Sequence, residues 1–160
     1  CLLLNKCVIA RPDPKALLCE MKKIILIPCV SKKLEYKSKA EDLYISTLFR
    51  LSLAYAKKIK PDKIFILSAK HGLVNLNDEI APYNETLNDK SVSDKKVWAE
   101  KVVFELEKVT NLKNDLFIFL VGKNYRECIL PHVKNYEIPL KGLRIGEQLK
   151  FLKNKLEQTN

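Results

Sequence analysis

The chain has few of the residues that interrupt helices and strands or that cross-link a fold. Its 160 residues include only four glycines, seven prolines and five cysteines. This composition excludes a collagen-like chain and a small scaffold held together by disulfides. Because 47% of the residues are apolar, an intrinsically disordered chain is excluded as well. The length then predicts one compact domain with a substantial core.

The sequence also lacks the short motifs that mark common nucleotide-binding and hydrolytic folds. It contains no G-x-x-x-x-G-K-[ST] phosphate loop, no G-x-G-x-x-G fingerprint and no G-x-S-x-G elbow. H-E-x-x-H and C-x-x-C are absent too, and histidine occurs only twice. Since no histidine and cysteine cluster has the spacing of a metal site, we expect neither a metal ion nor another cofactor.

The first twenty residues differ from the rest of the chain. The chain does not begin with methionine, its only methionine is Met21, and residues 1–20 hold three of the five cysteines. Polar residues and prolines interrupt each apolar run there, so the pattern fits neither a signal peptide nor a membrane span. We expect residues 1–20 to be a non-native or disordered extension of a single α/β domain over residues 21–160. The two cysteines that remain, Cys29 and Cys128, favour a cytoplasmic protein.

Positive charge is the main excess in the composition. The formal net charge is +10, and the basic residues belong almost entirely to residues 21–160. Such a balance favours an anionic partner such as nucleic acid, a nucleotide or an acidic membrane surface, although many basic proteins bind none of these. No apolar run is long enough to cross a membrane, and we expect no membrane partner.

Short apolar runs alternate with longer amphipathic stretches. The runs predict strands at 23–27, 63–67 and 116–121, with a weaker one at 136–140. The amphipathic stretches predict helices at about 42–59, 93–109, 124–131 and 145–157. Pro139 places the fourth strand at an edge, and the longest loop is expected at 69–92. The alternation predicts an α/β fold, a three-layer sandwich with a mostly parallel sheet of about four strands flanked by helices.

The unusual residues follow the predicted strands. In an open parallel sheet, ligands bind beyond the carboxyl ends of the strands. All four glycines, one histidine and at least one basic residue per loop fall in the four segments that begin there, 28–33, 68–73, 122–126 and 141–146. The pattern predicts a rim of basic and polar side chains suited to an anionic or polar ligand.

Six residues on or near this rim are candidates for catalysis. They are Cys29, Ser31, Ser68, Lys70, His71 and Glu85. Cys29 could be a nucleophile activated by nearby lysines, or a small core residue at a strand end. The two serines could contact a phosphate or a base edge, or simply form turns. His71, whose pKa a neighbouring cation should lower, could be a general base or a structural residue, and Glu85 is the one acid we nominate.

A second group is predicted to bind ligand. It consists of Lys32, Lys33, Tyr44, Tyr83, Gly122, Lys123, Tyr125, Arg126 and Gly146. The basic members could neutralise phosphates, whereas other lysines lie on predicted helix faces that water solvates. The tyrosines could stack on a base, or they could be amphipathic rings at the margin of the core.

At these positions the sequence resembles a family of bacterial, archaeal and phage domains known as domain of unknown function 6884, over roughly residues 24–152. Six blocks occur in order: Pro28-Cys29, Asp42-Leu43-Tyr44-Ile45-Ser46-Thr47-Leu48-Phe49, Ser68-Ala69-Lys70-His71-Gly72-Leu73, Pro82-Tyr83-Asn84-Glu85-Thr86-Leu87, Gly122-Lys123-Asn124-Tyr125-Arg126 and Gly142-Leu143-Arg144-Ile145-Gly146-Glu147-Gln148-Leu149-Lys150-Phe151-Leu152. The resemblance implies a family and leaves its function open.

A more distant similarity is to the core domain of archaeosine synthase, which acts on a 7-deazaguanine base in tRNA through the motif P-C-S-x-x-K-P-Y-x-x-S-x-x-H. Pro28, Cys29, Lys33 and Ser38 match this motif, whereas Val30, Leu34, Glu35 and Glu41 depart from it. Both resemblances extend to uracil-DNA-glycosylase-like folds and the YaaA-type stress proteins. They imply a nucleobase, nucleotide or nucleic acid as partner.

Two functions remain open. The first is a cytoplasmic enzyme that acts on a nucleobase, nucleotide or nucleic acid, such as a glycosylase-like or 7-deazaguanine-related enzyme, at the strand-end rim. The second is a non-catalytic module that binds nucleic acid or a nucleotide, with an affinity that falls steeply as salt rises. A protein-interaction domain is a third reading, which the strand-end cluster disfavours. The substrate, the reaction and the oligomeric state stay undetermined.

Overall fold

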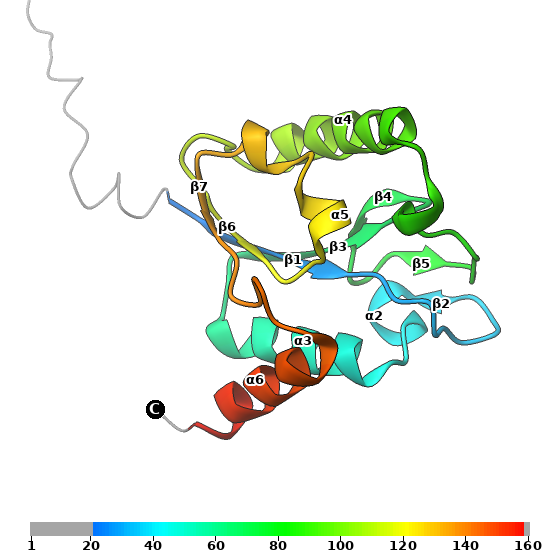
Figure 1. Ribbon diagram of the computed structural model, residues 1–160, viewed down its shortest axis with the longest axis vertical. Helices are drawn as coiled ribbons and strands as arrows, with labels where there is room; N and C mark the ends of the chain where they lie inside the picture. The colour runs from blue at the N-terminus through cyan, green and yellow to red at the C-terminus, as the bar shows by residue number, and fades with distance from the viewer. Residues whose placement is uncertain (1–20, 159–160) are drawn as a thin grey trace, which may run out of the picture.

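A computed structural model describes residues 21–158 and shows an α/β arrangement with helices on both sides of a central sheet (Figure 1). The expectation for residues 1–20 concerns a segment outside these residues. Among the residues described, no helix combines the length and the apolar character that crossing a membrane requires.

The main sheet has five strands in the order β4-β3-β1-β6-β7. Their bounds are β1 Lys23–Pro28, β3 Lys63–Ser68, β4 Gly72–Asn75, β6 Leu116–Phe119 and β7 Asn135–Glu137. β1, β3, β6 and β7 are parallel, and β4 is antiparallel to β3 at one edge. Five consecutive residues of β1 are buried, as a central parallel strand covered on both faces requires.

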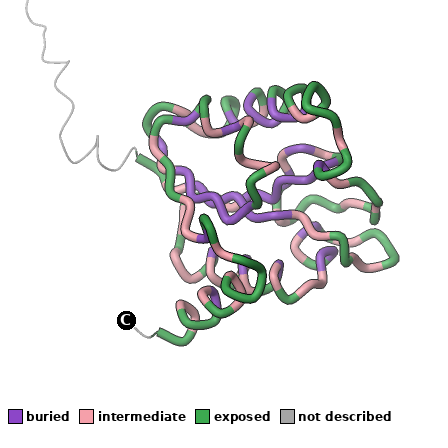
Figure 2. Tube along the Cα trace, viewed as in Figure 1, coloured by how far each residue is buried: buried purple, intermediate pink, exposed green. Residues whose placement is uncertain are grey.

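Each face of the sheet packs against its own set of helices. Ile24 and Leu26 point into the cluster formed with α4 (Val92–Val109). Ile25 and Ile27 point the other way, into the cluster formed with α2 (Ala40–Leu43), α3 (Thr47–Ile59) and α6 (Ile145–Glu157). The alternation of side chains along the strand therefore divides the core into two halves. In Figure 2, buried residues, drawn in purple, run along the strands of the central sheet between these halves.

Much of this architecture matches the sequence-based predictions. The mixed α/β class and the mostly parallel sheet are confirmed, and all four predicted strands are present, with β7 at an edge. β6 and β7 end earlier than predicted, at Phe119 and Glu137. The helix predicted at 93–109 corresponds to α4, and the one at 145–157 has the bounds of α6.

Three predictions were wrong in detail. The single helix predicted at 42–59 is two helices, because Ser46 begins α3 by accepting a hydrogen bond from the Phe49 amide. The helix predicted at 124–131 is α5 (Lys123–Arg126) followed by the 3-10 turn η3 (Leu130–His132), where Pro131 cannot continue the α-helical ladder. The loop predicted at 69–92 contains β4, β5 (Glu79–Ile80) and the 3-10 turn η2 (Leu87–Asp89).

A second, two-stranded sheet joins two remote segments beside the carboxyl end of the main sheet. β2 (Ser38–Lys39) pairs antiparallel with β5. The amides of Ala40 and Glu41, at the start of α2, donate to the carbonyls of Asp78 and Leu76. These contacts hold the segment after β1 against the segment after β4, and both segments carry predicted site residues.

Candidate functional site

A cavity of about 230 Å³ lies at the carboxyl end of β1. It is lined by Cys29, Val30, Ser31, Lys33, Asn84, Glu85, Thr86, Asn88 and Tyr125. At roughly 30 Å³ per liquid water molecule, this volume corresponds to about eight waters, which is room for one planar ring or a short chain. A larger hollow of about 390 Å³, between Lys22, Lys108 and Asp115, contains none of the predicted site residues.

Hydrogen bonds from neighbouring strands position the walls of the cavity. The Cys29 amide donates to the Leu67 carbonyl of β3 at 3.3 Å, which extends the strand pairing beyond β1. Gly122 begins α5, and the Arg126 guanidinium donates back to the Val121 carbonyl at 2.9 Å. This short helix therefore projects Tyr125 from the end of β6 toward the end of β1.

Tyr125 joins three of the segments around the cavity. Its phenol oxygen accepts from the Cys29 thiol at 3.5 Å and from the Leu87 amide at 3.4 Å. Its ring meets the Trp98 ring edge-on, with centroids 5.6 Å apart. Burial, with a smaller contribution from Cys29, raises the pKa of Tyr125 to about 12, so the phenol is neutral at neutral pH.

A line of three hydroxyl groups runs from β3 to the segment after β1. Ser68 Oγ donates to the Tyr83 hydroxyl at 2.7 Å and accepts from the amides of Lys70 and His71. The Tyr83 hydroxyl lies 2.6 Å from that of Tyr44. Burial is the main cause that raises the pKa of both phenols, to about 12 for Tyr44. These groups are therefore uncharged hydrogen-bonding partners and not bases at neutral pH.

Lys33 connects this hydroxyl line to the cavity. Its Nζ lies 4.4 Å from the centroid of the Tyr83 ring and 5.6 Å from that of Tyr44. It also donates to the Ser31 carbonyl at 3.5 Å. Desolvation lowers the pKa of Lys33, and the nearby Cys29 opposes that shift. The amine is thus held by aromatic rings at the wall of the cavity.

His71 lies beside the hydroxyl line and outside the cavity. Its ring meets the Tyr83 ring edge-on, with centroids 5.3 Å apart, and its buried Nε2 has no hydrogen-bond partner among residues 21–158. Burial lowers the pKa of His71, Lys70 and Lys101 lower it further, and Glu85 opposes them. The direction matches the sequence-based expectation, but burial is a larger cause than the neighbouring cation.

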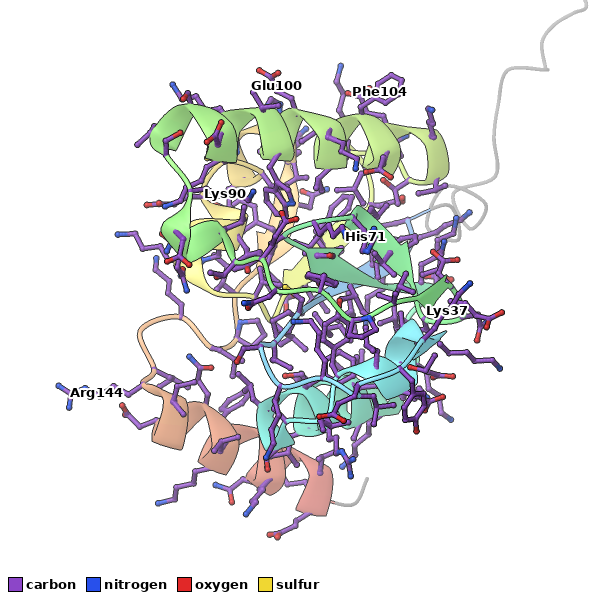
Figure 3. All side chains as sticks on the ribbon, turned by 90° about the vertical axis from the view of Figure 1, so that its right-hand side faces the viewer. Lys37, His71, Lys90, Glu100, Phe104 and Arg144 are labelled. Atoms are coloured by element: carbon purple, nitrogen blue, oxygen red, sulfur yellow. The ribbon has the colours of Figure 1, made fainter. Side chains whose placement is uncertain are left out.

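The structure gathers some predicted residues at the cavity and leaves others elsewhere. Cys29, Ser31, Lys33, Glu85 and Tyr125 line it, and Ser68, Tyr44 and Tyr83 adjoin it through Lys33. Lys32 and Lys70 are exposed and are not part of its lining. Lys123 pairs with Glu127 at 3.6 Å, and Gly146 is exposed in the first turn of α6. Figure 3 shows Arg144, which precedes α6, well separated from His71.

Besides the apolar Val30, sequence reasoning missed four residues of the site. Asn84 and Thr86 line the cavity on either side of Glu85, and Asn88 follows two residues later. The Asn88 side-chain oxygen accepts from the Asn124 amide at 2.6 Å. Trp98 supports the site from α4, where its indole N–H donates to the Ser68 carbonyl at 2.8 Å. The sequence block at 82–87, which contains Glu85, could have indicated Asn84 and Thr86. No local sequence pattern indicated Asn88 or Trp98.

Comparison with known proteins identifies a family. Residues 24–154 match the model of a family of unknown function, DUF6884. The chain belongs to this family. No curated protein and no solved structure matches the chain. The DUF6884 match spans β1 through most of α6, so it includes every residue that lines the cavity.

Proposed function

We propose that this DUF6884 protein acts on a nucleobase, carried by a nucleotide or a nucleic acid, in the cavity at the end of β1. The observation that carries the proposal is the lining itself, which combines a tyrosine ring, several neutral polar side chains and a lysine in a space of about 230 Å³. A base is a planar ring with hydrogen-bonding edges, and proteins bind such rings by aromatic stacking and side-chain hydrogen bonds.

The polar residues fit the edge of a base. Asn84, Ser31 and Thr86 supply amide and hydroxyl groups at the cavity wall. The oxygen of Asn88 is engaged by Asn124, which leaves the Asn88 amide hydrogens for an acceptor on the ligand. Lys32 is exposed on the segment that follows β1, and we propose that it contacts a phosphate outside the cavity.

Two features of the sequence also support the proposal. The distant similarity to archaeosine synthase and to uracil-DNA-glycosylase-like folds favours a base as substrate, and the net charge of +10 favours an anionic carrier.

We infer the three-layer α/β arrangement from the two sets of helices that cover the sheet. A cytoplasmic location is proposed from the free cysteines Cys29 and Cys128.

A second candidate is a binding module without catalysis. The fully buried Ser68 hydroxyl is used in hydrogen bonds, and neither Lys70 nor His71 belongs to the cavity lining. The Glu85 carboxylate, the nominated acid, forms an ion pair with Lys90 at 3.3 Å. Of the six candidate catalytic residues, only Cys29, Ser31 and Glu85 could therefore touch a ligand in this cavity.

Calorimetry with a panel of bases, nucleotides and short oligonucleotides tests the binding. We expect Asn88→Ala to weaken binding at least about fivefold, because a lost hydrogen bond is worth about 1 kcal/mol or more. Asn77→Ala, in the exposed turn between β4 and β5, is the matched control and should bind as the wild type does. The proposal fails if no member of the panel binds, or if both variants bind alike.

Product analysis separates the enzyme from the binding module. Mass spectrometry of tRNA, DNA and free nucleotides after incubation should show a changed base, and Cys29→Ser or Glu85→Gln should abolish that change. If the ligand binds but all products are unchanged, the binding module is favoured, and its affinity should fall steeply between low and high salt.

A further inference from the structure

A basic segment, residues 31–39, follows β1 and ends with β2. It contains one acidic residue, Glu35, and four lysines, Lys32, Lys33, Lys37 and Lys39. Ser31 and Lys33, at its start, line the cavity. Figure 1 shows the segment extending past the carboxyl end of β1, and Figure 3, which looks at this end of the molecule, shows Lys37 at its margin. The positive charge of the segment therefore begins at the cavity and continues outward from it.

Hydrogen bonds fix both ends of the basic segment. The amide of Ile45 donates to the Lys32 carbonyl at 3.0 Å. The amide of Leu34 donates to the Leu43 carbonyl at 2.9 Å. At the other end, β2 pairs with β5. The three exposed residues 35–37 lie between these fixed ends. Because their backbone is already held, little conformational freedom is lost when they contact a partner.

Tyr36 lies between these fixed ends and is 64% exposed. The rings of Tyr44, Tyr83 and Tyr125 each pack edge-on or tilted against another aromatic ring. Tyr36 belongs to none of the aromatic pairs found among residues 21–158. A tyrosine that supports a core buries its ring, whereas a ring exposed beside lysines is typical of proteins that stack on unpaired bases.

Two lysines of the basic segment are available to an anion. Lys32 and Lys37 are exposed, and neither belongs to the ion pairs found in the part of the chain that the structure describes. Lys39 is less available, because it stands opposite Glu79 in the pairing of β2 with β5. Lysines without a carboxylate partner can neutralise phosphates and release the counterions bound to them.

We propose that the base is carried by a single-stranded nucleic acid, and that the basic segment is the surface on which this strand docks. Tyr36 stacks on a base that neighbours the one in the cavity, while Lys32 and Lys37 contact phosphates. The inference rests on the proposed function, in which a base occupies the cavity. It goes further by naming the carrier, which that function left open between a nucleotide and a nucleic acid.

The spacing along the segment fits a strand that continues out of the cavity. Tyr36 follows the cavity residue Lys33 by three positions, so their α-carbons are at most about 11 Å apart. At about 3.4 Å per stacked nucleotide, this length covers about three nucleotides. A duplex fits less well, because its paired and stacked bases offer no free face to Tyr36 and cannot enter the cavity without unpairing.

Variants of Tyr36 test the stacking contact in the full chain. The probe is a labelled single strand of mixed sequence and about twelve nucleotides, made as RNA and as DNA, and its binding is measured by fluorescence anisotropy. We expect Tyr36→Ala to weaken this binding at least about fivefold, the lower limit for one stacked base. Tyr36→Phe keeps the ring and should bind as the wild type does. Affinity for a mononucleotide should be unchanged in both variants, since its single base occupies the cavity.

Variants of the lysines test the charge contact. Replacing Lys32 and Lys37 together by glutamine should reduce the slope of log affinity against log salt by about 1.4, because each phosphate neutralised on a single strand contributes about 0.7. The matched control replaces Lys113 and Lys134, two exposed lysines that precede β6 and β7 at the opposite end of the strands. This control should keep the wild-type slope.

Three results would overturn the proposal in variants that circular dichroism shows to be folded. They are wild-type binding of the strand by Tyr36→Ala, an equal loss of slope in the control pair, and competition by polyglutamate as effective as by the unlabelled strand. The last result would indicate an acidic protein as partner. Mononucleotide binding without dependence of the strand on Tyr36 refutes the docking surface alone. Strand binding that depends on Tyr36, without mononucleotide binding, refutes base recognition in the cavity alone.

Discussion

The hydroxyl oxygens of Tyr44 and Tyr83 lie 2.6 Å apart although the residues are 39 positions apart in the chain. Tyr44 follows α2, and Tyr83 follows β5, so the pair exists only because β2 and β5 hold these two segments together. Ser68 extends the contact to the end of β3. The three hydroxyl groups join the segments behind the cavity into one hydrogen-bonded unit.

Removing the middle hydroxyl of this unit should destabilise the protein. Tyr83→Phe leaves the buried hydroxyls of Ser68 and Tyr44 without their common partner, which should cost about 1–3 kcal/mol of unfolding free energy in urea. Tyr36→Phe is the control, because Tyr36 is 64% exposed. Equal stability of the two variants would show that the hydroxyl line does not contribute to folding.

Two glycine substitutions should have opposite effects on thermal stability. Gly72 has φ +77°, and a Cβ there would lie 2.7 Å from Glu105 Oε1. Gly72→Ala should therefore cost about 1–2 kcal/mol and lower the melting temperature. Gly146, in the first turn of α6, has open space, and Gly146→Ala should raise stability by up to about 1 kcal/mol. A stabilising Gly72→Ala would contradict the tight turn between β3 and β4.

His71 should make stability depend on pH below neutrality. Because its pKa is lower in the folded protein than the ordinary 6.5, the unfolded chain binds the proton more readily. The stability that this difference in pKa contributes is fully present above pH 6.5, and it is lost as the pH falls through the lowered pKa of His71. We expect wild-type stability in urea to fall relative to His71→Gln between pH 7.5 and 5. Parallel curves for the two proteins would mean that His71 protonates equally in both states.

The contact between Asn124 and Asn88 should influence ligand binding more than folding. Asn124→Ala frees the Asn88 amide to rotate, and we expect nucleotide affinity to fall about fivefold, or about 1 kcal/mol. Calorimetry measures this loss, and Asn154→Ala, exposed on α6, is the control. An unchanged nucleotide affinity in Asn124→Ala would contradict the proposed role of Asn88 in binding the base.

Burial on both faces explains why the central strands could be predicted. β1, β3 and β6 appear as continuous apolar runs because parallel strands pack against helices on each side. β4 was missed because its four residues, Gly72–Asn75, are too few to show a periodic pattern. β2 and β5 have two residues each and no periodicity, so only their mutual pairing defines them.

By itself, the sequence determined the α/β class, the family and the gathering of Cys29, Ser31, Lys33 and Tyr125 near the strand ends, because parallel strands bring their carboxyl ends to one edge. Only the tertiary structure decided which candidates share a cavity. It separated Lys70 and Gly146 from the lining and joined Tyr44 to Tyr83. The reason is that hydroxyl pairing, desolvation of Lys33 and the position of Asn88 depend on contacts between remote segments, which no local pattern encodes.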